Sequence, residues 1–208
     1  MKAISLFSAI DFLGVITGAF GGALAARRNA TYQYDLVGVL GLGLVSALGG
    51  GIVRDVLIQH GPPLALVDVR YLYAAFFGAL LGLFLGRSVG SVAQRILLIV
   101  DAAALALFAV AGATRALDSG LLWLPALLLG CVTAVGGGSL RDVLTGRTPR
   151  VFERGELYAI VAVAASAVFF VCNATGVSRS VATGMGVGIG FFFRLLALCF
   201  RWETGAIR

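Results

Sequence analysis

The chain has 208 residues, of which 60% are hydrophobic and only 12% are charged, and its formal charge is +6. Soluble domains carry about 25% charged residues, so this composition argues against a soluble fold, which could not hide so much apolar surface. The positive charge does not indicate nucleic acid as a partner. Most arginines lie at the ends of apolar runs, where they would meet anionic lipid headgroups.

Seven apolar runs predict an all-α integral membrane protein with seven transmembrane helices. A bilayer core about 30 Å thick needs roughly 20 apolar residues in a helix. The breaks between the runs carry charges or turn-forming residues, and none is long enough for a separate soluble domain, so residues 1–208 are predicted to form a single membrane domain. The predicted spans are about 4–26, 36–58, 71–86, 92–113, 121–144, 157–172 and 177–200.

The 16 basic residues orient these spans. With seven crossings the two termini lie on opposite faces, and the face that carries the C-terminus holds most of the arginines. The positive-inside rule then places the N-terminus outside and the C-terminus in the cytoplasm of a multi-pass protein of the cell inner membrane.

A repeated string is the most informative feature of the sequence. Residues 49–57 read Gly-Gly-Gly-Ile-Val-Arg-Asp-Val-Leu, and residues 136–144 read Gly-Gly-Gly-Ser-Leu-Arg-Asp-Val-Leu. Seven of the nine positions are identical, at an offset of 87 residues, which chance does not explain even in a glycine-rich chain. The string therefore indicates an internal duplication.

The likeness extends beyond the string. Each half opens with an aspartate in an apolar helix, Asp11 or Asp101, and each string is followed by a proline-containing loop and by Leu-Tyr-Ala, at 72–74 and 157–159. The unit contains three helices, an odd number, so the two copies enter the membrane in opposite directions as a 3+3 inverted repeat. The first repeat is predicted at about 4–86, the second at about 92–173 and the seventh helix at about 177–200.

The glycine triplets permit two interpretations. Each glycine costs a helix about 1 kcal/mol relative to alanine, so a triplet can let a membrane helix kink or open. Carbonyls freed by an open turn can replace part of a cation's hydration shell. The alternative is that the triplets only allow close helix packing. Because both triplets precede Arg-Asp, we favour a pore or substrate path. The candidate residues are Gly49, Gly50, Gly51, Gly136, Gly137 and Gly138, with Ser46, Thr133 and Ser139 as further oxygen donors.

Charged residues within membrane spans are costly, so they are usually paired or functional. Asp11 and Arg54 are predicted at the same depth on adjacent helices, and the same holds for Asp101 and Arg141. We therefore predict the pairs Asp11–Arg54 and Asp101–Arg141. Two alternatives remain open: the arginines line a pore directly, or they snorkel to lipid headgroups.

The aspartates that follow the arginines, Asp55 and Asp142, can cap the next loop or attract cations at a pore mouth. The single histidine, His60, lies in a proline-containing connection, and the three cysteines are isolated in apolar runs. This pattern shows no cluster for a metal, no cofactor motif and no nucleophile with a base nearby. The sequence therefore predicts a protein that is not an enzyme and needs no cofactor.

At the doubled Gly-Gly-Gly-x-x-Arg-Asp string the chain resembles the prokaryotic members of the trimeric intracellular cation channel family. The stretches 11–14 and 101–113 are also similar to that family, and the resemblance covers about residues 5–195. It implies a homotrimer with one hourglass pore per protomer, lined by the second and fifth helices. By position, the triplets would be the kinks of those helices, and Arg54 and Arg141 the charged residues of the pore region.

The resemblance also implies passive conduction of potassium and, less selectively, sodium. The expected partners are therefore these ions, membrane lipids and two further copies of the chain. An alternative is a secondary transporter of a small solute such as an amino acid, because inverted repeats are common among transporters. A third possibility is a membrane scaffold, which predicts no flux and no wet path.

Overall fold

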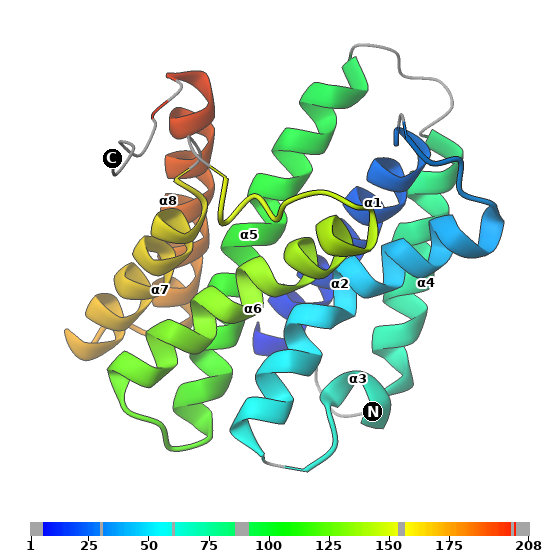
Figure 1. Ribbon diagram of the computed structural model, residues 1–208. Helices are drawn as coiled ribbons and strands as arrows, with labels where there is room; N and C mark the ends of the chain where they lie inside the picture. The colour runs from blue at the N-terminus through cyan, green and yellow to red at the C-terminus, as the bar shows by residue number, and fades with distance from the viewer. Residues whose placement is uncertain are drawn as a thin grey trace.

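The computed structural model describes residues 6–29, 31–59, 61–85, 92–153, 157–200 and 202. Lys2 and His60 lie outside these residues. Within them the chain is all-helical and forms eight helices (Figure 1). They are α1 Leu6–Arg27, α2 Leu36–Ile58, α3 Leu64–Val67, α4 Val69–Leu85, α5 Val92–Asp118, α6 Trp123–Leu144, α7 Tyr158–Ala174 and α8 Arg179–Cys199.

Five of these helices, α1, α2, α5, α6 and α8, are long and apolar enough to cross a membrane. The other two long helices, α4 and α7, are apolar but have only 17 residues each, as expected from the short third run of each repeat. Large hydrophobic side chains such as Phe77 and Leu128 are exposed, which suits a surface that faces lipid.

One helix was not predicted. The prolines after the first glycine string suggest a plain loop, but Leu64–Val67 forms the short helix α3, and α4 begins at Val69 instead of at residue 71. Pro63 is the N-cap of α3 with φ −52°. Proline has no backbone N–H, and the start of a helix loses no hydrogen bond by this, because an N–H there has no partner within the helix. A proline that the sequence suggests as part of a loop therefore starts a short helix.

Local chemistry explains the bounds of α2. The Asp35 side chain accepts a hydrogen bond from the Gly38 N–H at 2.7 Å and so caps the first turn. At the other end Gln59 adopts a left-handed backbone conformation, φ 56°, which stops the helix. Between these two residues the helix is continuous.

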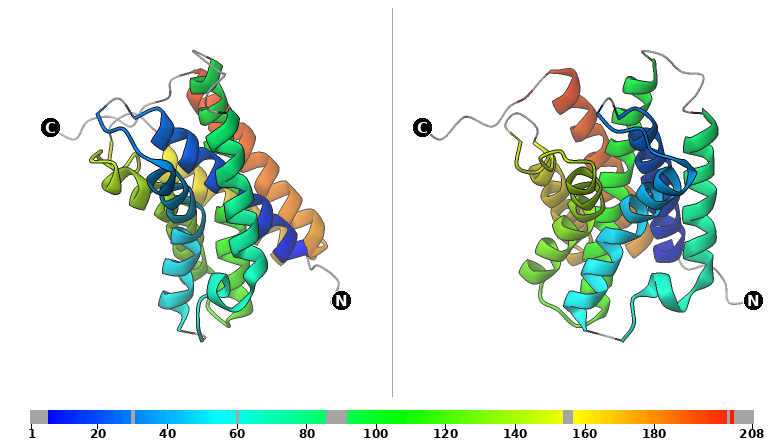
Figure 2. Two further views of the ribbon diagram at one scale, coloured as in Figure 1. Left: turned by 90° about the vertical axis from the view of Figure 1, so that its right-hand side faces the viewer. Right: turned by 45° about the vertical axis from the view of Figure 1, so that its right-hand side comes forward.

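The helices form two groups of three that lie side by side. Helix α1 packs against α2 and α4, α5 packs against α6 and α7, and the groups meet along α1–α5 and α2–α6. Helix α8 packs on α5 and α7 and has no counterpart in the first group. Figures 1 and 2 show α4 and α8 on opposite sides of the molecule, with α1 and α5 between them.

Small residues let the helices approach closely, as is usual between membrane helices. A Cβ atom added at Gly43 on α2 would lie 3.1 Å from the Ala19 carbonyl oxygen of α1. One added at Gly130 on α6 would lie 2.8 Å from the Ala109 carbonyl oxygen of α5. Gly43 and Gly130 are separated by 87 residues, so the duplication seen in the string also relates the packing of the two groups.

Candidate functional site

The glycine triplets lie at the contact between α2 and α6. Both helices continue through the triplets, so the open turn expected from the sequence is not present. A Cβ atom at Gly50 would overlap the carbonyl oxygen of Thr133, and one at Gly137 would overlap that of Ser46. In this conformation the triplets act as the packing interpretation predicts, because the missing side chains let the two backbones touch.

The three predicted oxygen donors have different surroundings. The Ser46 side chain is buried and lines a small cavity beside Arg141. The Thr133 hydroxyl donates a hydrogen bond to the Leu129 carbonyl at 2.6 Å, within its own helix. Ser139 does not line that cavity but faces the loop after α6. Of the three, Ser46 alone lines this cavity.

The structure brings each predicted pair of charges together inside the helix bundle. Arg54 Nη1 lies 3.9 Å from Asp11 Oδ1, and Arg141 Nη1 lies 3.7 Å from Asp101 Oδ1. All four side chains are buried. Neither arginine therefore reaches lipid headgroups, as the snorkelling alternative required.

Each arginine also binds the aspartate that follows it in sequence. Arg54 Nε donates to Asp55 Oδ1 at 2.8 Å, and Arg141 Nε donates to Asp142 Oδ1 at 2.9 Å. The second oxygen of Asp55 accepts the Leu64 N–H at 2.8 Å, and that of Asp142 accepts the Arg150 N–H at 3.5 Å. Both aspartates thus hold the loop that follows them. This geometry matches the loop-capping role suggested by the sequence.

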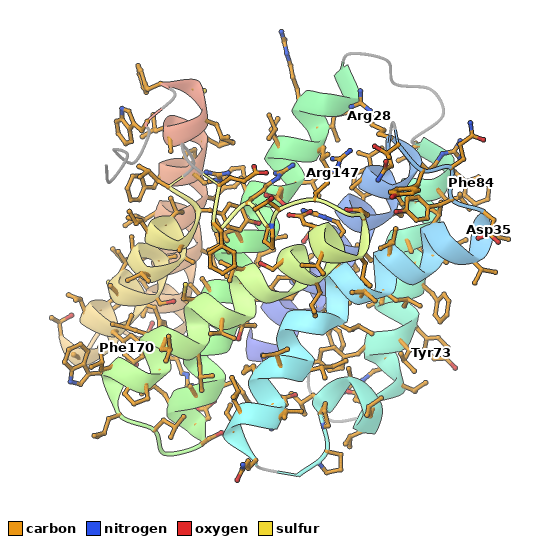
Figure 3. The ribbon with its side chains drawn as sticks, in the orientation of Figure 1. Arg28, Asp35, Tyr73, Phe84, Arg147 and Phe170 are labelled. Carbon is orange, nitrogen blue, oxygen red and sulfur yellow. The ribbon has the colours of Figure 1, made fainter. Side chains whose placement is uncertain are left out.

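A buried tyrosine completes the site in each half. Tyr71 donates a hydrogen bond to Asp11 Oδ2 at 2.8 Å, and Tyr158 lies under the guanidinium of Arg194 from α8, 4.8 Å from the ring centre. The alignment of the two Leu-Tyr-Ala segments was wrong here, because it matched Tyr73 to Tyr158. Tyr73 is 67% exposed and points away from the bundle (Figure 3). The offset of 87 residues, which relates the two glycine strings, pairs Tyr71 with Tyr158. Applied to this segment, it could have identified Tyr71 as the buried tyrosine of the first half.

Cavities of unequal size adjoin the two clusters. A vestibule of about 540 Å³ opens beside Arg141 and Asp142, with further arginines around it, including Arg28 at the end of α1 and Arg147 in the loop after α6 (Figure 3). A cavity of about 20 Å³ also lies beside Arg141, and a separate one of about 10 Å³ lies beside Arg54. A wide cavity therefore adjoins the Arg141 cluster, and only a small one adjoins the Arg54 cluster.

A larger open cavity of about 620 Å³ lies elsewhere, between the C-terminal ends of α1 and α4 and the start of α2. Arg27, Asp35 and Phe84 are among the residues that line it, and none of the buried ion pairs does. The buried charges and the vestibule together therefore make up the candidate site.

The fold and this site define a multi-pass α-helical membrane protein built on an internal duplication. A family model described as "Glycine transporter" matches the chain twice, at residues 8–87 and 98–174, once for each three-helix group. The inner membrane protein YadS of Escherichia coli is 33% identical over 93% of this chain and 91% of its own length. A membrane protein of Deinococcus radiodurans is 42% identical over 74% of this chain and 71% of its own length.

Solved structures agree with these matches. The TRIC trimeric intracellular cation channel orthologue from Rhodobacter sphaeroides has a TM-score of 0.87 and 34% identity, over 94% of this chain and 98% of its own. A second TRIC cation channel, solved in a study of conductance, has a TM-score of 0.84 and 33% identity, over 98% of both chains. The chain belongs to the prokaryotic TRIC family, to which the glycine-transporter model also corresponds. The resemblance predicted from the doubled string is confirmed, and these neighbours are channels, not enzymes.

Proposed function

We propose that the protein is a passive cation channel, with potassium preferred over sodium and one path in each protomer between α2 and α6. The observation that carries this proposal is the charge balance of the two buried clusters. Arg54 and Arg115 face Asp11 and Asp55, while Arg141 and Arg150 face Asp101 and Asp142. Within these two clusters each arginine faces a carboxylate, so a cation there meets no uncompensated arginine, which would otherwise repel it strongly in a low-dielectric interior.

The glycine triplets supply the movement that conduction requires. The contact of Gly50 and Gly137 with opposing carbonyls leaves little space between α2 and α6. Bending of both helices at Gly49–Gly51 and Gly136–Gly138 separates them, and the carbonyls of Ser46 and Thr133 then face the opened path. Carbonyl oxygens can replace part of the water shell of a potassium ion.

For the rest of the architecture we propose the plan predicted from the sequence. Residues 1–208 form one membrane domain with seven crossings, in which α1, α2 and α4 form the first repeat, α5, α6 and α7 the second, and α8 the seventh span. The arginine-rich vestibule and the C-terminus face the cytoplasm, and the N-terminus lies outside. Three copies assemble in the inner membrane, in contact with its lipids. Light scattering of the detergent-solubilised protein measures the number of copies.

The test is conductance of the purified protein in planar bilayers with asymmetric potassium chloride. Discrete currents should reverse close to the equilibrium potential of potassium. The matched control is the double variant Asp11→Asn and Asp55→Asn, which leaves Arg54 without its two carboxylates and should shift the reversal potential towards chloride. Absence of discrete currents from correctly folded protein would overturn the proposal.

A second candidate is a carrier of a small amino acid. Two observations favour it: the matching family model is described as a glycine transporter, and the site is open to a wide vestibule on one side only. Carriers with inverted repeats alternate the side on which a central site is open. Saturable uptake of labelled glycine into proteoliposomes, coupled to an ion gradient and without discrete currents, would favour the carrier.

A further inference from the structure

One aromatic side chain separates the two small cavities. The cavity beside Arg141 and the cavity beside Arg54 have different linings, and Phe108 of α5 is the one described residue that lines both. Phe108 is 6% exposed, so its ring fills the space between them. The cavity on the Arg141 side shares the lining residue Arg141 with the vestibule, whereas Leu64 and Ala65 of α3 line the cavity on the Arg54 side.

The inverted repeat is asymmetric at this point. When Asp11 is aligned with Asp101, the position of Phe108 on α5 corresponds to Gly18 on α1. A Cβ atom added at Gly18 would lie 3.2 Å from the Phe108 ring, and one added at Gly14 would lie 2.9 Å from it. The second repeat therefore supplies a large ring, and the first supplies the two glycines that make room for it. Two phenylalanines at the equivalent positions would not fit in this space.

The surroundings of the ring are suited to a seal. The last glycine of each triplet lines the cavity on its own side, Gly138 with Arg141 and Gly51 with Arg54. Charged clusters thus lie on both sides of an apolar ring, and a narrow apolar constriction of this kind blocks ions by excluding water.

We propose that Phe108 is the apolar seal between the two halves of the permeation path, and that displacement of its ring lets a cation pass. The proposal rests on the proposed function for its physiological meaning. The seal itself concerns only which parts of the interior are reached by water from each face, and it can be tested without measuring ion flow.

The experiment uses two cysteine reporters, Gly138→Cys on the vestibule side of the ring and Gly51→Cys on the far side. At both positions an added Cβ finds only ordinary contacts, at 3.6 Å and 3.8 Å respectively, so the backbone leaves room for the first atom of the new side chain. The native cysteines Cys131, Cys172 and Cys199 are replaced by alanine. The small cationic reagent methanethiosulfonate ethylammonium is applied to the vestibule face of proteoliposomes, and initial labelling rates are measured by mass spectrometry.

With Phe108 present, we expect the vestibule-side reagent to label Gly138→Cys at least about tenfold faster than Gly51→Cys, because the dry ring blocks the way. In the Phe108→Ala background the two rates should become similar. The matched control is Leu105→Ala, which removes a buried side chain of the same helix that lines only the cavity beside Arg141. It should leave the ratio of rates unchanged.

Similar labelling of both reporters while Phe108 is present would overturn the proposal, and this measurement does not depend on how the Phe108→Ala variant folds. A persistent difference in folded Phe108→Ala protein would also overturn it. If labelling follows the prediction but the protein carries no ion currents, the proposal of a Phe108 seal stands and the proposal of a channel is wrong. In planar bilayers, Phe108→Ala should raise the time-averaged current severalfold, and Leu105→Ala should not.

Discussion

The two halves of the molecule share one sequence motif but surround it differently. In the first half, Arg54 and its aspartates lie beneath α3, next to a cavity of only about 10 Å³. In the second half, Arg141 and Asp142 line a vestibule of about 540 Å³. The same arginine–aspartate chemistry therefore lies beneath a short helix in one repeat and beside a wide vestibule in the other.

The segment after the glycine string causes this difference. In the first repeat Pro63 starts α3, and the Leu64 N–H at its beginning binds Asp55 at 2.8 Å, which holds α3 over the cluster. In the second repeat the corresponding contact, from the Arg150 N–H to Asp142, is 3.5 Å long, and no helix covers the cluster in the described part of the loop. A short proline-initiated helix is enough to make related sites unequal.

The third partner of each cluster differs as well. Asp11 accepts a hydrogen bond from Tyr71, whereas Asp101 faces Arg150 at 3.3 Å. Tyr158 packs instead beneath Arg194, which comes from α8, the helix that the first repeat lacks. The extra helix therefore changes the second site without any change in the repeated string.

The largest expected effect contrasts the two arginines. Arg54→Gln should destabilise the protein by about 3–5 kcal/mol, because Asp11 and Asp55 remain buried without their main cation. Arg141→Gln should cost clearly less. Arg150 stays 3.3 Å from Asp101 and vestibule water can reach the cluster, whereas the cation left in the first cluster, Arg115, lies 4.0 Å from Asp55. Thermal unfolding in detergent measures both. Equal losses would mean that the vestibule does not hydrate the second site, and Asp11→Asn added to Arg54→Gln should restore part of the stability.

An intermediate effect is expected at the helix crossing, where the halves should behave alike. Gly50→Ala and Gly137→Ala each force a methyl group onto an opposing carbonyl and should cost about 1–3 kcal/mol. Their neighbours Gly51→Ala and Gly138→Ala have room for the methyl and should gain up to about 1 kcal/mol from better helix propensity. Unfolding in the same detergent separates the two classes. Tolerance of alanine at both central positions would show that the triplets are not in contact.

The smallest effect on stability is expected at the two buried tyrosines, Tyr71 and Tyr158, which differ in their partners. Tyr71→Phe removes the hydrogen bond to Asp11 and should cost about 1 kcal/mol, as polar contacts between membrane helices typically do. Tyr158→Phe keeps the ring beneath Arg194 and loses no side-chain hydrogen bond that the described residues form. It should therefore leave the unfolding temperature unchanged. A reversed order of the two variants would contradict the assignment of Tyr71 to the Asp11 site.

The sequence predicted the features that depend on depth in the membrane. The duplicated string sets equal distances along two helices, so Asp11 and Arg54, like Asp101 and Arg141, reach matching levels and pair. The short local match at Leu-Tyr-Ala failed, because three similar residues near a helix start can be shifted by two positions without any loss of apolar character. Phe108 was not predicted, since a phenylalanine in an apolar span carries no signal that distinguishes a seal from ordinary packing.

By itself the sequence determined the class of protein, the duplication, the family and the charged residues that meet, because composition and spacing along a helix are one-dimensional properties. Only the tertiary structure decided that the triplets touch across α2 and α6, that α3 covers one cluster, and that Phe108 faces the glycines of α1. The physical reason is that glycine permits both bending and close contact. Which of the two occurs depends on the helices packed around the glycine, and the periodicity of a single helix does not specify those neighbours.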